Sequence, residues 1–407
     1  MQTPDISQVS TILASLYQQM TGQAVPAPLD LSGWISTATT VLNLGLDKVH
    51  NAIWNMIGET IIAVRPYQSR FADLEFDTTS WGIVDRKISY LSRLPQDNQA
   101  YKPPVTWDTS AGATNPSGDG ESVDMYKINK DKPVQVAFYG QETYSYTRTR
   151  FAEQLKTAFR GPEEMTRFLS GALTSLNNDR EGWKEGMRRG LLINAIGSLA
   201  DESKTGRVIH ALTEFNTETG LSLTATTVRQ PANFDAFCKW LYAKMGDVKA
   251  LMAENNVLFT TQLSSYPAGY GVLRHTDGEN LRIKMSAAFI NRMRAGVLSD
   301  TYNPELLSLE GIEPVAYWQS PKAPESVRVI PRYTTADGVE STGADSVTVS
   351  NIIGMMYDKD FVGCANIQST FDTTPFNTKG RYWNDDMTEL YKTRFDMTEK
   401  AILITLD

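Results

Sequence analysis

The residues of this chain best suited by type to chemistry are its Asp and Glu carboxylates. A glycoside hydrolase needs two carboxylates about 5–9 Å apart across the scissile bond. Acidic residues lie close together in sequence at three places: Asp73/Glu75/Asp77, Glu163/Glu164 and Asp385/Asp386. The first group alternates along a segment without helical period, and the second favours the positive end of a helix that begins there. We therefore assign no catalytic residue, and an acidic-residue hydrolase stays as an alternative function.

Metal and cofactor sites have no signature in the sequence. His50, His210 and His275 each lack a second ligand-type residue at metal spacing, and residues 275–279 favour a polar turn with Asp-Gly at its corner. Cys238 and Cys364 stand far apart and form neither a zinc motif nor a disulfide framework. Glycine-rich nucleotide loops and the common hydrolase motifs are absent. We expect no metal and no cofactor.

The composition is that of an ordinary folded protein, with 41% hydrophobic and 21% charged residues. The net charge of −8 argues against a dedicated nucleic-acid binder, which would carry a clustered basic excess. This charge is common among soluble proteins, and it also suits a protein shell that encloses nucleic acid without binding it tightly. Two distant cysteines fit a reducing compartment. No Lys or Arg precedes Lys48 and no apolar run approaches about 20 residues, so we expect a soluble protein made in the cytoplasm, with no signal peptide and no membrane contact.

The elements that position these residues begin with helices. Apolar residues recur at helical spacing over 5–21, and Gly22 with the prolines that follow ends this amphipathic arm. The arm must bury its apolar stripe on its own body or on a neighbour. A second helix is expected over roughly 32–60.

Residues 67–147 predict an extended excursion. They show no helical period, and residues 109–122 have the composition of a flexible tip. Residues 134–138 and 144–147 alternate with period two, as half-buried strands do. So long an excursion would be wasteful in an isolated monomer, and we expect it to lie across another subunit.

A long helix is expected over 163–199, because its apolar residues keep to one stripe in steps of three, four and seven. Gly171, Gly182, Gly186 and Gly190 each cost about 1 kcal/mol relative to alanine. They indicate close packing or a bend, so this stretch is either one continuous helix or a helix in two segments.

From Pro231 the sequence predicts mixed α and β structure, and the fold class is α+β. Helices are expected over 233–249 and 286–294, and a loop over 334–346. Strands are expected at 257–260, 315–318, 327–330, 352–357 and, at the C-terminal end, 401–407.

Aromatic and arginine side chains are enriched at protein interfaces. Eight such residues lie in or near the excursion or in the C-terminal stretch, and they are our candidates for intersubunit contacts: Trp107, Tyr126, Tyr144, Tyr146, Arg148, Arg150, Arg381 and Trp383. The alternative is that the aromatic residues cover their own sheet and the arginines form a solvated face.

The order of these parts resembles the major capsid proteins of tailed bacteriophages, which have the HK97-type fold. The C-terminal pattern resembles the podovirus type in particular: residues 356–360 (MYDKD), 373–377 (TTPFN), 394–396 (RFD) and 401–404 (AILI). The resemblance implies five parts: an N-terminal arm and helical lead-in (1–66), an extended E-loop (67–140), a P-domain with a spine helix (141–230), an A-domain (231–369) and a return to the P-domain (370–407).

The resemblance also implies a structural protein and not an enzyme. Copies would assemble through hexamers and pentamers into an icosahedral shell around double-stranded DNA, in the virion, after assembly in the host cytoplasm. No long charged coiled-coil segment precedes the excursion, so the implied partners are a separate scaffolding protein, a portal, and DNA held by weak non-specific contacts. Lys102, Lys127, Lys130 and Lys132 lie where some relatives crosslink, but we predict no crosslink. An encapsulin-like compartment and a tail or baseplate component remain alternatives.

Overall fold

The computed structural model divides the chain into two units. Unit 1 comprises Met1–Val84, Tyr139–Ala195 and Val362–Phe395, and unit 2 comprises Asp85–Phe138, Ile196–Phe361 and Asp396–Asp407. The structure describes these residues: 6–23, 31–44, 48–49, 69–76, 85–93, 125–126, 128, 130, 132–202, 206–264, 266, 270–298, 311–341 and 345–407.

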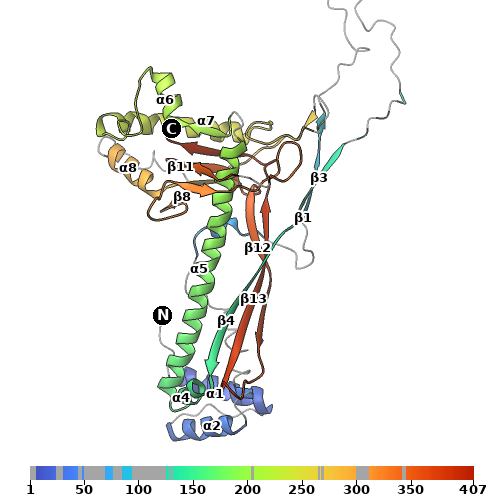
Figure 1. Cartoon of the computed structure of the whole chain (residues 1–407), viewed down its shortest axis with the longest axis vertical. Coiled ribbons are helices and arrows are strands. Elements are labelled where there is room, and N and C mark those ends of the chain that lie inside the picture. Colours follow the sequence, from blue (N-terminus) through green and yellow to red (C-terminus); the bar gives the residue numbers. More distant parts are fainter. Residues whose placement is uncertain are drawn as a thin grey trace, which may run out of the picture. The chain divides into compact units, whose positions relative to one another are not determined.

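Unit 1 is built on a long helix beside a three-stranded antiparallel sheet (Figure 1). The helix α5 spans Pro162–Glu202, of which the residues up to Ala195 belong to this unit. The sheet has the order β12-β13-β4, with β12 at Val362–Thr373, β13 at Tyr382–Phe395 and β4 at Gly140–Phe151. Burial alternates along β4 and β13, because successive side chains of a strand point to opposite faces. The more buried face of the sheet covers α5.

Three short helices gather at one end of this sheet (Figure 1). They are α1 at Ile6–Thr21, α2 at Leu31–Asn43 and α4 at Ala152–Ala158. Their apolar residues share one core with β13, in which Leu13, Trp34, Leu155, Trp383 and Met387 are all buried. The N-terminal arm therefore buries its stripe within its own unit.

The centre of unit 2 is a five-stranded sheet of order β5-β14-β11-β7-β8. Its strands are β5 at Val208–His210, β14 at Ala401–Thr405, β11 at Ile352–Asp358, β7 at Leu281–Ser286 and β8 at Ile312–Val315. Every residue of β11 and β14 is buried. The helices α6 (Ala211–Thr219), α7 (Pro231–Ala253) and α8 (Ala287–Leu298) contribute to the same core. The C-terminal strand is thus an interior strand of this sheet.

Three strand pairs complete unit 2. β1 (Asp85–Tyr90) and β3 (Pro133–Phe138) form an antiparallel ribbon, which we call the ribbon (Figure 1). β2 (Ser92–Arg93) follows β1 and pairs with β6 (Tyr270–Gly271). β9 (Val327–Val329) pairs with β10 (Val347–Val349).

The strongly periodic segments fold as the sequence predicts. The helices expected over 5–21 and 233–249 and the C-terminal strand are confirmed as α1, α7 and β14. The helix expected over 163–199 is a single element, so the two-segment alternative is wrong. Of the helix expected over 32–60, α2 ends at Asn43 and most of the rest lies outside the described residues.

Two strand predictions in unit 2 are wrong in detail. Residues 257–260 form a turn, in which Phe259 has a φ of 63°, a left-handed conformation that no strand contains. The Oγ1 of Thr260 donates to the carbonyl of Val257 across that turn. Of residues 315–318 only Val315 belongs to a strand, because β8 begins earlier.

Gly354 lies in β11, where the neighbouring strand leaves no space for a side chain. A Cβ built there would stand 2.5 Å from the carbonyl oxygen of Lys284 and 2.9 Å from Cγ of Met285. We expect Gly354→Ala to lower the free energy of unfolding by about 1–3 kcal/mol, because the core must shift. Urea unfolding measures this. Gly186→Ala is the matched control: nothing lies within 4 Å of its Cβ on helix α5, so it should stabilise by about 0.4–1 kcal/mol. Equal effects would contradict the argument.

Candidate functional site

Three of the carboxylates that could have served a hydrolase contact cations or hydroxyls of their own unit, whereas Asp77 and the side chains of Glu163 and Glu164 lie outside the described residues. Asp385 is buried and accepts from Nε of Arg150 at 3.0 Å, Asp386 accepts from Thr147, and Glu75 pairs with Arg188. Within the described residues no group of His, Cys, Asp or Glu is arranged to hold a metal ion. Nor does any described helix have the length and apolar character to cross a membrane.

The two cysteines are buried and free. Burial raises the pKa of Cys238 to about 12 and that of Cys364 to about 11. A thiol with so high a pKa holds little thiolate near neutral pH and is a poor nucleophile.

Five of the predicted contact residues lie on β4 and β13, and all five, Arg148 included, have partners within unit 1. Tyr144 and Tyr146 of β4 contact the ring of Trp183 on α5, and Tyr144 also approaches Tyr391 of β13. Trp383 is buried, with its ring centroid 4.6 Å from that of Phe376. Arg150 pairs with Asp385, and desolvation lowers its pKa, an effect that Asp385 opposes. An intersubunit role for these residues stays a prediction.

The remaining candidates are more exposed. Arg148, also on β4, pairs with Asp179 of α5, and Arg381 pairs with Glu153 at 2.7 Å on an open surface. Tyr126 is 86% exposed. Trp107 lies outside the described residues.

The ribbon has two faces of different chemistry. The side chains of Ile88 and Tyr90 point to one face and are 60% and 65% exposed. Lys87 and Ser89 point to the other face and reach side chains of the same unit. The outer face therefore exposes two large apolar side chains beside Arg86 and Gln135, and the inner face carries Lys87 and Ser89 opposite Val136 and Val134.

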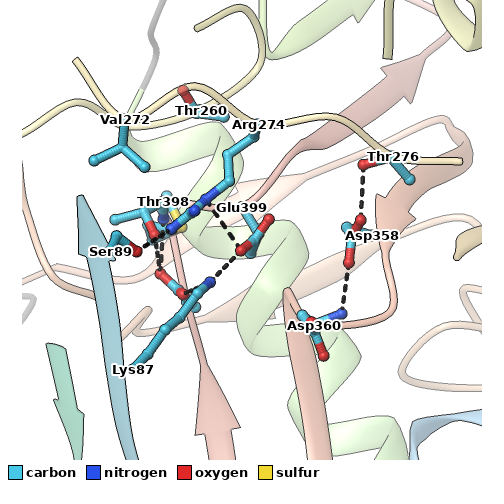
Figure 2. Close-up of polar contacts among 12 residues, drawn as sticks. Lys87, Ser89, Thr260, Val272, Arg274, Thr276, Asp358, Asp360, Thr398 and Glu399 are labelled. Carbon is cyan, nitrogen blue, oxygen red and sulfur yellow. Dashed lines mark hydrogen bonds and ion pairs between the residues drawn. The ribbon is translucent and has the colours of Figure 1, made fainter. Parts of the chain in front are cut away.

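A charge cluster joins the inner face of the ribbon to the residues just before β14 (Figure 2). Nζ of Lys87 lies 2.7 Å from Oδ2 of Asp396 and also pairs with Glu399. Glu399 also forms an ion pair with Arg274, whose Nε lies 3.1 Å from Oε1, and a terminal nitrogen of Arg274 donates to Oγ of Ser89 at 2.8 Å. Two cations and two buried carboxylates thus meet at the base of the ribbon.

The turn at residues 396–400, which we call the anchor turn, carries both carboxylates. Buried Arg207 donates to the carbonyl oxygens of Met397, Glu399 and Ala401. On the same turn, Nζ of Lys400 donates to three carbonyls at the C-terminal end of α7: Leu251, Met252 and Glu254. Burial lowers the pKa of Arg207 to about 10 and that of Lys400 to about 8, so the guanidinium stays charged near neutral pH.

Comparison with known proteins decides what this architecture is. The family model described as Phi29-like phage major capsid protein matches residues 10–405, nearly the whole chain. The chain belongs to this family. It is a major capsid protein of a tailed phage, it forms the icosahedral shell together with other copies, and it is a component of the virion. The family is structural and not enzymatic, which overturns the hydrolase alternative.

Solved structures support the fold of this capsid protein. A chain of the capsid structure of Staphylococcus phage Andhra matches with a TM-score of 0.54 at 9% identity, over 84% of both chains. A structure described as head fiber and inner core protein gp22 of native bacteriophage P68 matches with a TM-score of 0.53 at 9% identity, over 84% of this chain and 85% of that one. A search of curated proteins found no match. The predicted resemblance to podovirus-type capsid proteins is confirmed, and the mixed α/β fold matches HK97-type capsid structures.

The charge cluster of this capsid protein could not be predicted from the sequence. Lys87 is 309 positions from Asp396 and 312 from Glu399 in the chain. The only local signal is the alternation over 85–90, which places Lys87 and Ser89 on one face of a strand.

Proposed function

We propose that this capsid protein builds its shell from hexamers and pentamers, in which the excursion over 67–140 laps onto neighbouring copies and the N-terminal arm, whose apolar stripe is buried in its own unit, contacts them with its opposite face. The observation that carries the proposal is the outer face of the ribbon. A two-stranded ribbon is at best marginally stable in water, and one that also exposes Ile88 and Tyr90 needs a cover. Self-assembly provides one, because every subunit of a closed shell has neighbours.

The five parts implied by the HK97-type resemblance are the finer level of the proposal. Residues 1–66 are assigned to the arm and lead-in, 67–140 to the E-loop, 141–230 to the P-domain, 231–369 to the A-domain, and 370–407 to the return to the P-domain. Two observations support this division: α5 is a single long helix, as a spine helix would be, and the ribbon is built from β1 and β3. β14 of the last part pairs with β5 of the assigned P-domain and with β11 of the assigned A-domain.

The partners proposed besides the chain itself are a separate scaffolding protein, a portal and packaged double-stranded DNA. The net charge of −8 supports weak DNA contacts, because like charges keep the wall and the phosphates apart.

Assembly of variants altered on the outer face tests the lapping proposal. We expect the double variant Ile88→Glu/Tyr90→Glu to fold, because substitutions at exposed positions usually change stability by less than about 0.5 kcal/mol. It should form few or no closed shells, because a carboxylate at each position would have to be desolvated at the contact. Co-expression with the neighbouring genes, negative-stain microscopy and light scattering measure this. The matched control, Ile88→Val/Tyr90→Phe, keeps these two positions apolar and should assemble.

Deletion of residues 109–122 tests the same proposal at the expected tip of the excursion. We expect a folded subunit that fails to close shells. Normal shells from both the deletion and the double-glutamate variant would contradict lapping by the excursion, while leaving the capsid identity intact.

A further inference from the structure

The ribbon is held at its base by side chains of one turn. Along β1 the inner positions are Asp85, Lys87 and Ser89. Lys87 contacts Glu399, and Ser89 contacts Arg274 (Figure 2). Lys87 also donates to Asp396. The carboxylates are nearly inaccessible, with side-chain exposures of 2% for Asp396 and 8% for Glu399. Charged contacts of this kind are stronger than neutral ones.

The anchor turn itself is fixed from several directions. The N–H of Asp396 donates to the carbonyl of Phe361 at 2.8 Å, and the N–H of Thr261 donates to that of Met397 at 2.9 Å. Oδ1 of Asp396 accepts from N–H and Oγ1 of Thr398 at 2.9 and 2.7 Å. With Arg207 beneath, the turn is far more constrained than a two-stranded ribbon can be. The ribbon is the partner that moves when the cluster opens.

We propose that Lys87 and Glu399 form a proton-sensitive latch: with Glu399 ionised two carboxylates hold the ribbon on the anchor turn, and protonation of Glu399 leaves only Asp396 and loosens the ribbon. Two arms of the cluster meet at this one carboxylate. Lys87 comes from the ribbon, whereas Arg274 comes from the segment that carries β6. Adding a proton to Glu399 removes the negative charge that the two cations share.

The surroundings of Glu399 favour proton uptake. Burial raises its pKa, and the cations Lys87 and Arg274 oppose this. Asp396 keeps a lowered pKa despite burial, because Lys87 and Thr398 stabilise its charge, so the first proton enters at Glu399. The other groups that face the two carboxylates are Arg207, Lys400 and Tyr266. Lys87 holds the pKa of Glu399 down, and therefore release of Lys87 and protonation of Glu399 promote each other.

Ribbon release is separable from unfolding of unit 2. Because the pKa of folded Glu399 lies above its ordinary value, this group adds stability to the fold as the pH falls through that pKa. Asp396, with a lowered pKa, begins to cost stability only at lower pH. Between the two titrations Lys87 keeps its pair with Asp396 but loses the one with Glu399, so the ribbon should loosen while the five-stranded sheet stays protected. Release of the ribbon would also alter how the excursion meets a neighbouring copy. This consequence rests on the function proposed above.

Hydrogen–deuterium exchange on the purified, unassembled full chain tests the latch. Going from about pH 7.5 to about pH 5, with the intrinsic exchange rate corrected, we expect exchange of the β1 and β3 amides to accelerate about tenfold, the scale set by one charged hydrogen bond. Exchange in β11 and β14 should not change. Glu399→Gln should show the fast exchange already at the higher pH and lose its pH dependence. Glu325→Gln, which neutralises the half-exposed partner of Arg229 in the same unit, is the matched control and should behave as wild type.

Lys87→Met is the second variant, in case Glu399→Gln fails to fold, and it opens the same contact from the ribbon side. Ribbon exchange that is independent of pH in the wild type, or equally slow in Glu399→Gln and Lys87→Met, would overturn the latch. Such a result would leave the lapping proposal intact, because lapping is tested by shell formation with variants of the outer face. The latch is tested on the subunit before any assembly.

Discussion

Replacing Arg207 by methionine should lower the free energy of unfolding of the subunit by about 3–5 kcal/mol, the range for breaking a buried ion pair. The guanidinium is almost fully buried and lies 3.1 Å from Oε2 of Glu202, which is itself buried. It also donates to Oγ1 of Thr261 at 2.7 Å and to three carbonyls around the anchor turn. Methionine fills much of the volume but removes the cation from Glu202 and the side-chain donor from the carbonyls of Glu399 and Ala401, while Met397 keeps the N–H of Thr261.

The size of this effect comes from the acceptors that remain. An unsatisfied buried carbonyl costs about 1–3 kcal/mol, and an uncompensated buried carboxylate costs more. Domains are stable by only about 5–15 kcal/mol, so the variant should yield little soluble subunit. Arg207→Lys should recover only part of the loss, because one ammonium cannot span contacts that the planar guanidinium makes from three nitrogens.

Urea-induced unfolding of the unassembled subunit measures the change. Arg229→Met is the control: Arg229 pairs with Glu325 at 2.7 Å, but both side chains are partly exposed, and such pairs contribute about 0–1 kcal/mol. If Arg207→Met cost no more than this control, backbone hydrogen bonds alone would have to hold the anchor turn. The latch would then lose the support that Arg207 gives to the turn.

The sequence predicts the elements whose burial follows one period of apolar residues. α1, α7 and α5 each keep apolar residues on one helical stripe, and β14 is apolar throughout, so a local rule suffices for all four. The wrong strand at 257–260 shows the limit of that rule, because a short apolar run fits a buried turn as well as a strand.

β13 was missed for the opposite reason. Its buried positions alternate as a strand requires, but they carry Asp385 and Glu389 between Trp383, Met387 and Tyr391. Charged residues at core positions hide the period of two, and only their partners on other elements explain their burial. Those partners, Arg150 and Arg180, lie 235 and 209 positions away, so the pairing cannot be deduced from one sequence without the fold.

The charge cluster of the ribbon shares this cause. From the sequence alone, Lys87 in an extended segment is expected to be solvated, and the carboxylates of the anchor turn are expected to be ordinary turn residues. Only the topology, which sets β1 beside the turn before β14, makes them one site.

The second large effect concerns the contact between helix and sheet in unit 1, where Arg180 of α5 reaches fully buried Glu389 of β13. Oε2 of Glu389 accepts from the hydroxyl of Tyr391 at 2.9 Å, and its other oxygen lies 3.4 Å from both Asn366 and Ser369. Arg180 forms an ion pair with this carboxylate, and the buried ammonium of Lys184 on the same helix also interacts with it electrostatically. We expect Arg180→Met to cost about 3 kcal/mol of unfolding free energy, the lower end of the range for breaking a buried ion pair, because Lys184 still offsets part of the buried charge.

A double variant separates the loss of the Arg180–Glu389 ion pair from the cost of leaving the Glu389 carboxylate buried without that partner. Arg180→Met/Glu389→Gln removes both charges, while the amide oxygen of the introduced glutamine can still accept from Tyr391. This double variant should be more stable than Arg180→Met alone by about 1–3 kcal/mol. Arg148→Met is the matched control, because Arg148 joins β4 to the same helix through Asp179, but on an exposed surface where the expected loss is below about 1 kcal/mol.

Urea unfolding of the wild type, the two single variants at positions 180 and 389 and the double variant gives the coupling energy. Additive losses in the double variant would mean that burial of Glu389 is relieved when Arg180 is gone. Helix α5 would then be held to the sheet by the aromatic contacts of Trp183 with Tyr144 and Tyr391 instead.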